Sequence, residues 1–110
     1  MPDIKQIETE LGINIQAAIL EEIPHPLLDE HNITLRIKRD DLIHPIISGN
    51  KWRKLKYTLQ HALNNGHEHL ISMGGAYSNH LHALAYIGHQ LKLKTTGLIR
   101  GEPPAKENQT

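Results

Sequence analysis

Beyond an N-terminal arm, three segments with strand patterns alternate with two segments with helix patterns. Residues 33–40 (ITLRIKRD) alternate aliphatic and polar side chains, which is typical of a half-buried strand. Residues 69–73 (HLISM) and 94–101 (KTTGLIRG) are short runs of strand length. Helices are expected over about 50–65 and 78–91, where apolar residues recur at helical spacing. This alternation predicts the α/β class, with a parallel βαβαβ sheet and helices packed on its faces.

A sheet of this kind would be incomplete in 110 residues. Three parallel strands would leave open edges, and residues 102–110 (EPPAKENQT) are polar and carry no pattern of their own. Residues 33–110 are therefore expected to form a truncated portion of a larger α/β domain. Residues 1–32 are expected to form an arm that combines a helix with an extended segment, because the two prolines of PHPLL (24–28) restrict the backbone.

Composition excludes several classes of function. The absence of cysteine excludes a disulfide framework, a CxxC redox site and a thiolate zinc site. Lys plus Arg and Asp plus Glu both total 12, and this balance argues against nucleic acid as a partner. The charged N-terminus has no signal-peptide core, and no apolar run approaches the roughly 20 residues of a membrane span. We therefore expect a cytoplasmic protein that does not bind membranes.

The nine histidines do not have the spacing of a metal site. His67 and His69 would point to opposite faces of a strand, and His80 and His82 would diverge on a helix. We therefore expect no metal ligands among them.

Lys51 lies where a Gly-Asn turn leads into the first predicted helix, within SGNKWRKL (48–55). It lies at the margin of the apolar stripe, near unpaired helix N–H groups, where partial desolvation would favour the neutral amine. One interpretation is a solvated basic surface shared with Arg53, Lys54 and Lys56. The other is a reactive amine in a pocket, as covalent catalysis requires. The spacing alone leaves both open.

The same helix has a distinct apolar face. It is formed by Trp52, Leu55, Leu59 and Leu63. We expect this face to pack against the sheet. Arg53 and Lys54 lie far from it on the helix and are expected to be exposed.

A second candidate site is the strand-to-helix turn SMGGAYSNH (72–80). Ligands of parallel sheets bind at the carboxyl ends of strands, and Ser78 and Asn79 are both favourable at a helix N-terminus, where free N–H groups can hold a carboxylate or phosphate. An ordinary glycine turn with a serine cap is the alternative. The dinucleotide-binding pattern GxGxxG is absent.

Four motifs in order, PHPLL, IKRDDL, SGNKWRKL and SMGGAYSNH, resemble the N-terminal part of pyridoxal-phosphate enzymes of the tryptophan-synthase-β type. The motifs GNK-x-RKL and GG-x-x-SNH are most similar to those of the 1-aminocyclopropane-1-carboxylate (ACC) deaminase and D-cysteine desulfhydrase family. The resemblance covers about residues 24–101. It implies a lyase or deaminase that uses pyridoxal 5′-phosphate.

The resemblance also implies roles for individual residues. Lys51 matches the lysine that binds the cofactor covalently and later moves protons, and Asn50 precedes it in the family's Asn-Lys pair. Asn79 matches the asparagine that hydrogen-bonds the 3′ oxygen of the cofactor ring. Ser78 matches a serine that binds the substrate carboxylate or assists proton transfer. His80 occupies a substrate-contact position. We therefore expect Lys51 and Ser78 to approach each other, with Asn79 between them in one cleft.

The implied substrate is a small amino acid, D-cysteine or ACC, from which ammonia and an oxo acid are released, with sulfide from D-cysteine. Within the family resemblance, His80 favours D-cysteine as the substrate. Tyr77 differs from the family pattern, because it replaces the glutamine that usually precedes the serine.

Family members continue well beyond residue 110 with a second domain, a phosphate-binding loop and the group that faces the pyridine nitrogen. The resemblance therefore implies a chain that is inactive alone and a homo-oligomer in the full-length form. Two alternatives remain open. The chain could be a non-catalytic module that binds an anionic ligand at the 74–79 turn, or one that pairs with another chain.

Overall fold

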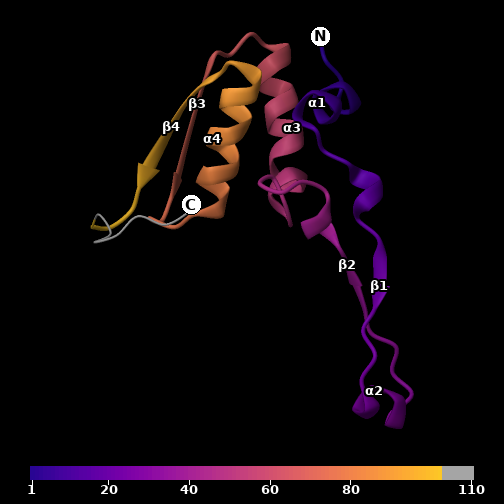
Figure 1. Cartoon of the computed structure of the whole chain (residues 1–110). Coiled ribbons are helices and arrows are strands. Elements are labelled where there is room, and N and C mark those ends of the chain that lie inside the picture. Colours follow the sequence, from indigo (N-terminus) through magenta and orange to yellow (C-terminus); the bar gives the residue numbers. More distant parts are fainter. Residues whose placement is uncertain (103–110) are drawn as a thin grey trace.

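The computed structural model describes residues 1–102. The chain forms helices and two separate pairs of strands (Figure 1). In chain order the elements are α1 (Ile4–Leu11), the 3-10 helix η1 (Ile15–Ala17), β1 (Leu20–Glu22), α2 (Pro26–Glu30), β2 (Arg36–Lys38), the 3-10 helix η2 (Asp40–Leu42), α3 (Lys51–Asn64), β3 (His69–Gly74), α4 (Asn79–Leu91) and β4 (Lys94–Ile99).

The strands β3 and β4 form a parallel sheet, with α4 as the crossover between them. Their register runs from His69 beside Lys94 to Gly74 beside Ile99. The crossover helix packs closely on β4 at Gly88, where an added Cβ would lie 2.4 Å from Thr95 Cγ2. The α/β class with a parallel sheet is therefore confirmed.

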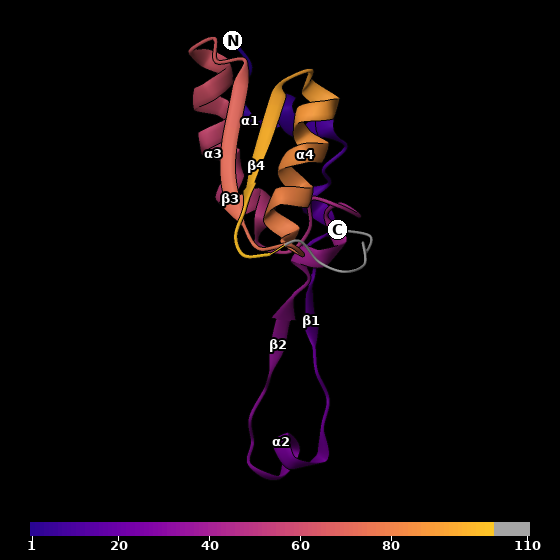
Figure 2. The same ribbon diagram turned by 90° about the vertical axis from the view of Figure 1, so that its left-hand side faces the viewer.

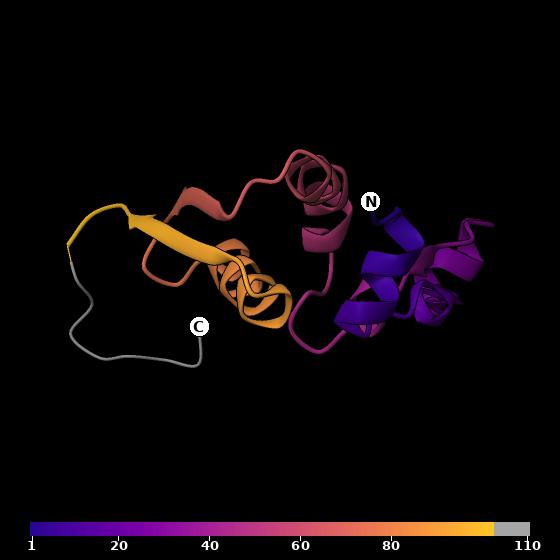
Figure 3. The same ribbon diagram turned by 90° about the horizontal axis from the view of Figure 1, so that it is seen from above.

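The core lies between the helices. It is formed by buried side chains from α1, the following loop, the loop before α3, and α3 and α4: Ile7, Leu11, Ile13, Ala18, Ile43, Ile47, Trp52, Leu59, Ala83 and Ile87. Viewed from above, α4 is the centre of this packing, since it contacts α1, α3 and both strands of the parallel sheet (Figure 3).

The helix α3 packs on other helices and not on the sheet. Its described contacts are with α1 and α4, and Trp52 Nε1 donates a hydrogen bond to Glu8 Oε1 in α1 at 2.9 Å. The expectation that its apolar face covers the sheet was therefore wrong, because helical periodicity shows that a face is buried but not what buries it. Arg53 and Lys54 are exposed, as predicted.

The strand expected over 33–40 is shorter and lies outside the parallel sheet. The strand β2 pairs antiparallel with β1, with Leu20 beside Lys38 and Glu22 beside Arg36, and both strands are exposed. Together with α2 they form an arm that projects from the helices (Figures 1 and 2). The prediction of a three-stranded parallel sheet was thus wrong for its first strand, because alternation predicts a strand but not its partner.

The segment PHPLL also differs from the expected extended conformation. Pro26 begins the short helix α2, and His25 Nδ1 accepts a hydrogen bond from the Leu27 N–H at 3.1 Å. Proline is favourable in the first helical position, where its missing N–H would have no partner. None of the helices in residues 1–102 is both long and apolar enough to cross a membrane.

Candidate functional site

The turn before α3 is fixed by Asp40, which lies in η2. The Gly49 N–H donates to the Asp40 carbonyl oxygen at 3.0 Å, and Gly49 has a φ of 62°, which favours glycine. The Asp40 carboxylate accepts two hydrogen bonds from Arg53, at 2.6 Å from Nε and 2.9 Å from Nη2. These bonds hold the pKa of Asp40 below its ordinary value. The first turn of α3, which carries Lys51, is therefore held to Asp40 by Gly49 just before the helix and by Arg53 within it.

Lys51 is the first residue of α3, and its amine is already engaged by its neighbour. Lys51 Nζ donates to Asn50 Oδ1 at 3.0 Å. Asn50 occupies the N-cap position of α3 but makes no capping bond with its side chain. Its amide oxygen therefore orients the lysine amine in place of capping the helix, and the Lys51 side chain is half-buried.

The second helix start follows β3 through a tight turn. An added Cβ at Gly74 would lie 2.6 Å from Ser78 Oγ, so only glycine permits this approach. Ser78 is the N-cap of α4, and its Oγ accepts a hydrogen bond from the Leu81 N–H at 3.2 Å. Asn79 is the first residue of α4, where backbone N–H groups have no partner in a preceding turn.

The starts of α3 and α4 meet at one cleft of about 290 Å³. Its lining comes from the loop before α3 and the first turns of both helices: Pro45, Ile46, Ser48, Gly49, Asn50, Lys51, Asn79 and His82. Its volume is at the lower end of the roughly 300–1,000 Å³ of ligand sites. The structure thus brings together Lys51 and Asn79, which the sequence predicted to share a cleft, and adds Asn50 to its lining.

Ser78, which the sequence predicted to share this cleft with Lys51, lies beside the cleft and not in its lining. It contributes to a neighbouring hollow of about 340 Å³, which also contains Gly75 and Ala76 of the turn. His82 lines both hollows and therefore forms the boundary between them. The Ser78 hydroxyl can still donate its own proton, because its bond with Leu81 uses the oxygen as an acceptor.

His80 points into a different groove. Its Nε2 lies 2.8 Å from Ser72 Oγ, and it lines an apolar groove between α3 and β3 together with Leu55 and Leu70. A helix turns by about 100° per residue, so the side chain after Asn79 leaves the face that Asn79 occupies. The structure does not bring His80 to the cleft that holds Lys51.

Sequence reasoning missed two residues that shape the cleft. His82 lies three residues after Asn79, and this spacing could have placed both on one helix face. His44 is buried, and its Nδ1 accepts hydrogen bonds from the N–H groups of Ile46 and Ile47 at 2.9 and 3.0 Å. Burial lowers the pKa of His44, so the neutral ring shapes the wall that Ile46 contributes. No local pattern marks His44, because its partners depend on the tertiary fold.

Comparison with families finds no family model that matches the chain. Comparison with individual proteins finds similar ones. A Thermotoga maritima protein named "Putative 1-aminocyclopropane-1-carboxylate deaminase" is 39% identical over 74 residues, which are 67% of this chain and 24% of that protein. A D-cysteine desulfhydrase of Salmonella paratyphi A is 36% identical over 80 residues, which are 73% of this chain and 24% of that enzyme.

Comparison with solved structures also finds a similar protein. The crystal structure of an ACC deaminase homologue has a TM-score of 0.69 and 30% sequence identity to this chain. The match covers 93% of this chain and 32% of the solved one.

The fold and the cleft define an α/β protein in which a lysine at one helix start faces an asparagine at another. The resemblance of this chain to the ACC deaminase and D-cysteine desulfhydrase family is confirmed by the similar proteins and the similar structure. The chain spans about a quarter of the length of the curated relatives that it matches, 22–24% of each of the first four.

Proposed function

We propose that this chain supplies the lysine-bearing part of a pyridoxal-phosphate-dependent deaminase or desulfhydrase. The observation that carries the proposal is the convergence of Lys51, Asn50 and Asn79 on one cleft. A lysine that belonged only to a solvated basic surface would not need an amide partner of its own or a second helix start facing it. The names of the similar proteins support the same class of reaction.

The side chains at the cleft fit pyridoxal 5′-phosphate. The cofactor binds enzymes through a lysine amine, and here the amine of Lys51 is held by the Asn50 amide at 3.0 Å. Asn79 adds a second amide, which can hydrogen-bond the oxygen on the cofactor ring. When bound, the cofactor supplies an electron sink for the reaction.

Each residue at the cleft has a distinct role in this proposal. Lys51 holds the cofactor through Nζ and afterwards moves protons at the substrate. Asn50 orients that amine, because it accepts its hydrogen bond. Ser78 donates its hydroxyl proton to the substrate carboxylate, which the free N–H groups at the start of α4 also attract. Ser78 lies in the hollow next to the cleft, so the substrate would lie across the boundary that His82 forms.

The proposed substrate is a small amino acid, D-cysteine or ACC, from which ammonia and an oxo acid are released. His80 does not favour either substrate, because its ring is hydrogen-bonded to Ser72 outside the cleft. We also propose that the chain alone has no appreciable turnover. Efficient catalysis needs a fixed, enclosed cofactor, and among the described residues only one loop and the first turns of two helices line the cleft.

Turnover assays test this proposal. The 110-residue chain is compared with a joined protein, in which this chain replaces the 74 matched residues of the Thermotoga maritima relative. Both are assayed with pyridoxal 5′-phosphate on ACC and on D-cysteine, and ammonia and oxo acid are measured. We expect turnover by the joined protein only, with a loss of about a thousandfold or more in its Lys51→Ala variant. Full activity in that variant would refute the role of Lys51.

A matched control is available on the same helix. Lys54 lies one turn after Lys51, is exposed, and does not line the cleft. The Lys54→Ala variant of the joined protein is therefore expected to keep its activity. Equal losses in both variants would favour a general effect of positive charge.

A further inference from the structure

The arm gathers most of its aliphatic side chains on one face. The pairing of β1 and β2 extends by one residue at each end, since the Arg39 N–H donates to Ile19 O and the Ile23 N–H donates to Leu35 O. Neighbours two apart in a strand share a face. One face therefore carries Ile19, Ile23, Leu35 and Ile37, together with the paired side chains of Glu21 and Arg39. We call the four aliphatic side chains of this face the apolar arm face. The opposite face carries Leu20, Glu22, Arg36 and Lys38.

The apolar arm face is exposed throughout. Ile19 is 54% exposed, Leu35 46% and Ile37 44%. Among the elements of residues 1–102, β1 and β2 contact only each other. Antiparallel strands with alternating side chains normally cover their apolar face with another layer, and an exposed aliphatic patch marks an interaction surface. The part of the chain that the structure describes provides no such layer for the arm.

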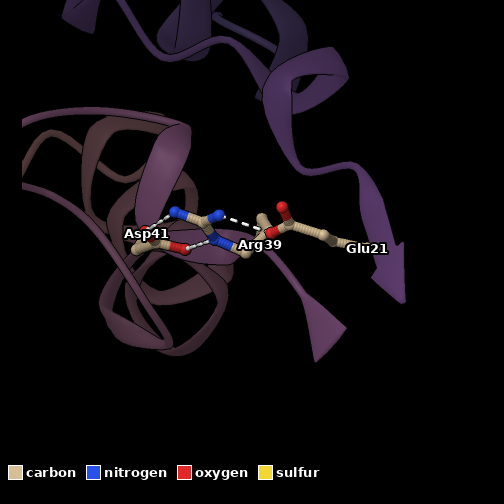
Figure 4. Close-up of polar contacts among 3 residues, drawn as sticks. All are labelled: Glu21, Arg39 and Asp41. Atoms are coloured by element: carbon tan, nitrogen blue, oxygen red, sulfur yellow. Dashed lines mark hydrogen bonds and ion pairs between the residues drawn. The ribbon is translucent and has the colours of Figure 1, made fainter. Parts of the chain in front are cut away.

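The arm is nevertheless held in a defined direction. Arg39, at its base, donates to Asp41 in η2 at 2.8 and 2.9 Å and to Glu21 in β1 at 2.6 Å (Figure 4). These bonds tie the arm to the loop that leads to α3. Because of the arm, the radius of gyration is 17.4 Å, whereas a compact domain of this length has about 13 Å. The structure thus projects a preformed aliphatic surface away from its own core.

The similar proteins indicate what covers this surface. The solved ACC deaminase homologue matches 93% of this chain, but only 32% of that homologue is matched. We propose that the apolar arm face docks on polypeptide equivalent to the unmatched part of this homologue. The inference uses the family resemblance and does not depend on the cofactor chemistry proposed above.

A second copy of this chain fits the surface less well. The apolar arm face has four aliphatic side chains. They cannot bury the roughly 800 Å² per partner that a stable interface needs.

Thiol labelling tests the proposal, because the chain contains no cysteine. Ile37→Cys places a thiol on the apolar arm face, and Lys38→Cys places one on the opposite face as the matched control. Both variants are made in the free chain and in the joined protein. Labelling rates are measured by peptide mass spectrometry, which identifies the labelled site directly.

We expect the Ile37→Cys thiol to react about tenfold or more slowly in the joined protein than in the free chain, since reaction then requires local opening. The Lys38→Cys thiol should react at similar rates in both. Equal rates for Ile37→Cys would overturn the proposal, and so would a joined protein that stays unfolded while the Thermotoga maritima relative folds. Protection in the free chain that disappears on dilution would assign the face to a second copy and overturn it as well.

This readout is independent of catalysis. A joined protein that also carries Lys51→Ala should show the same protection at Ile37→Cys. Loss of turnover with intact protection would therefore contradict only the proposed function, and loss of protection with intact turnover would contradict only the docking surface.

Discussion

The helical core and the arm use the same kinds of aliphatic residue with opposite outcomes. In the core, Ile7, Ile47 and Ile87 are fully buried, because helix faces from one chain can cover each other. In the arm, Ile19 and Ile37 are about half exposed, because a two-stranded ribbon has no second layer of its own. A pattern of apolar residues therefore predicts which face is buried only where the covering element is also present.

The candidate cleft belongs to the well-packed region, the helical core. Lys51 directly precedes Trp52, which is fully buried, and Asn79 begins the helix that contacts α1, α3 and the parallel sheet. A site that depends on the relative position of two helix starts needs such a rigid support. The core therefore positions the cleft, and the arm offers a surface to other polypeptide.

The largest difference between the two regions should appear in large-to-small substitutions. Trp52→Ala removes a fully buried ring and its hydrogen bond to Glu8, and it should lower the free energy of unfolding by about 3–5 kcal/mol. Ile37→Ala on the arm should cost less than about 0.5 kcal/mol in the free chain. Urea unfolding measures both. Similar losses would show that the arm is packed in the free chain.

A smaller effect is expected where α4 approaches β4. Alanine normally stabilises a helix interior relative to glycine. In Gly88→Ala, however, the new Cβ would lie 2.9 Å from the Leu93 carbonyl oxygen and 2.4 Å from Thr95 Cγ2. We expect the free energy of unfolding to fall by about 1–3 kcal/mol. Gly75→Ala, whose nearest contact would be Arg100 Nη2 at 3.9 Å, is the control and should change little. A more stable Gly88→Ala variant would contradict this packing.

The core should also respond to pH through His44. Burial lowers the pKa of His44 from its ordinary value of 6.5, so protonation costs the folded state more than the unfolded state. Its contribution to stability is complete above that value and is lost as the pH falls below it. The urea midpoint should therefore rise with pH up to about 6.5 and level off above it.

Two variants isolate this contribution. His44→Asn keeps an acceptor near the N–H groups of Ile46 and Ile47 but does not titrate, so the dependence on pH should become flatter. His89→Gln changes an exposed histidine and should leave the dependence as it is. An unchanged slope in His44→Asn would assign the pH dependence to other groups.

The smallest effect is expected at the base of the arm. Arg39 bonds Glu21 and Asp41 on the surface, and exposed ion pairs contribute little to global stability. Arg39→Gln should leave the urea midpoint nearly unchanged but speed hydrogen exchange of peptides that cover residues 19–39. Unchanged exchange would show that these bonds do not hold the arm.

The sequence predicted those parts of the fold that depend on local patterns. The helices around Lys51–Asn64 and Asn79–Leu91, the strand His69–Gly74 and the parallel pairing with Lys94–Ile99 follow from periodicity and turn residues. The sequence did not predict that residues 36–38 pair with 20–22, because the partner of a strand depends on contacts that periodicity does not contain.

The candidate site was predictable to a similar extent. The motifs identified Lys51, Asn50 and Asn79 before their common cleft was visible. The motifs did not predict that His82 lines the cleft, that His80 turns away from it, or that Asp40 and Arg53 anchor its edge. These features depend on the rotation of α4 and on the path of the loop before α3, which only the tertiary structure provides.

The central claim is that the cleft makes Lys51 chemically different from its basic neighbours. Borohydride reduction of the chain with pyridoxal 5′-phosphate, followed by peptide mass mapping, tests this claim most directly. We predict a reduction-stable adduct on Lys51 that is absent in Lys51→Ala and reduced in Asn50→Ala and Asn79→Ala, with Lys54 and Lys56 unmodified. Adducts spread equally over Lys51, Lys54 and Lys56 would contradict the claim, because Lys51 would then be one member of a solvated basic surface.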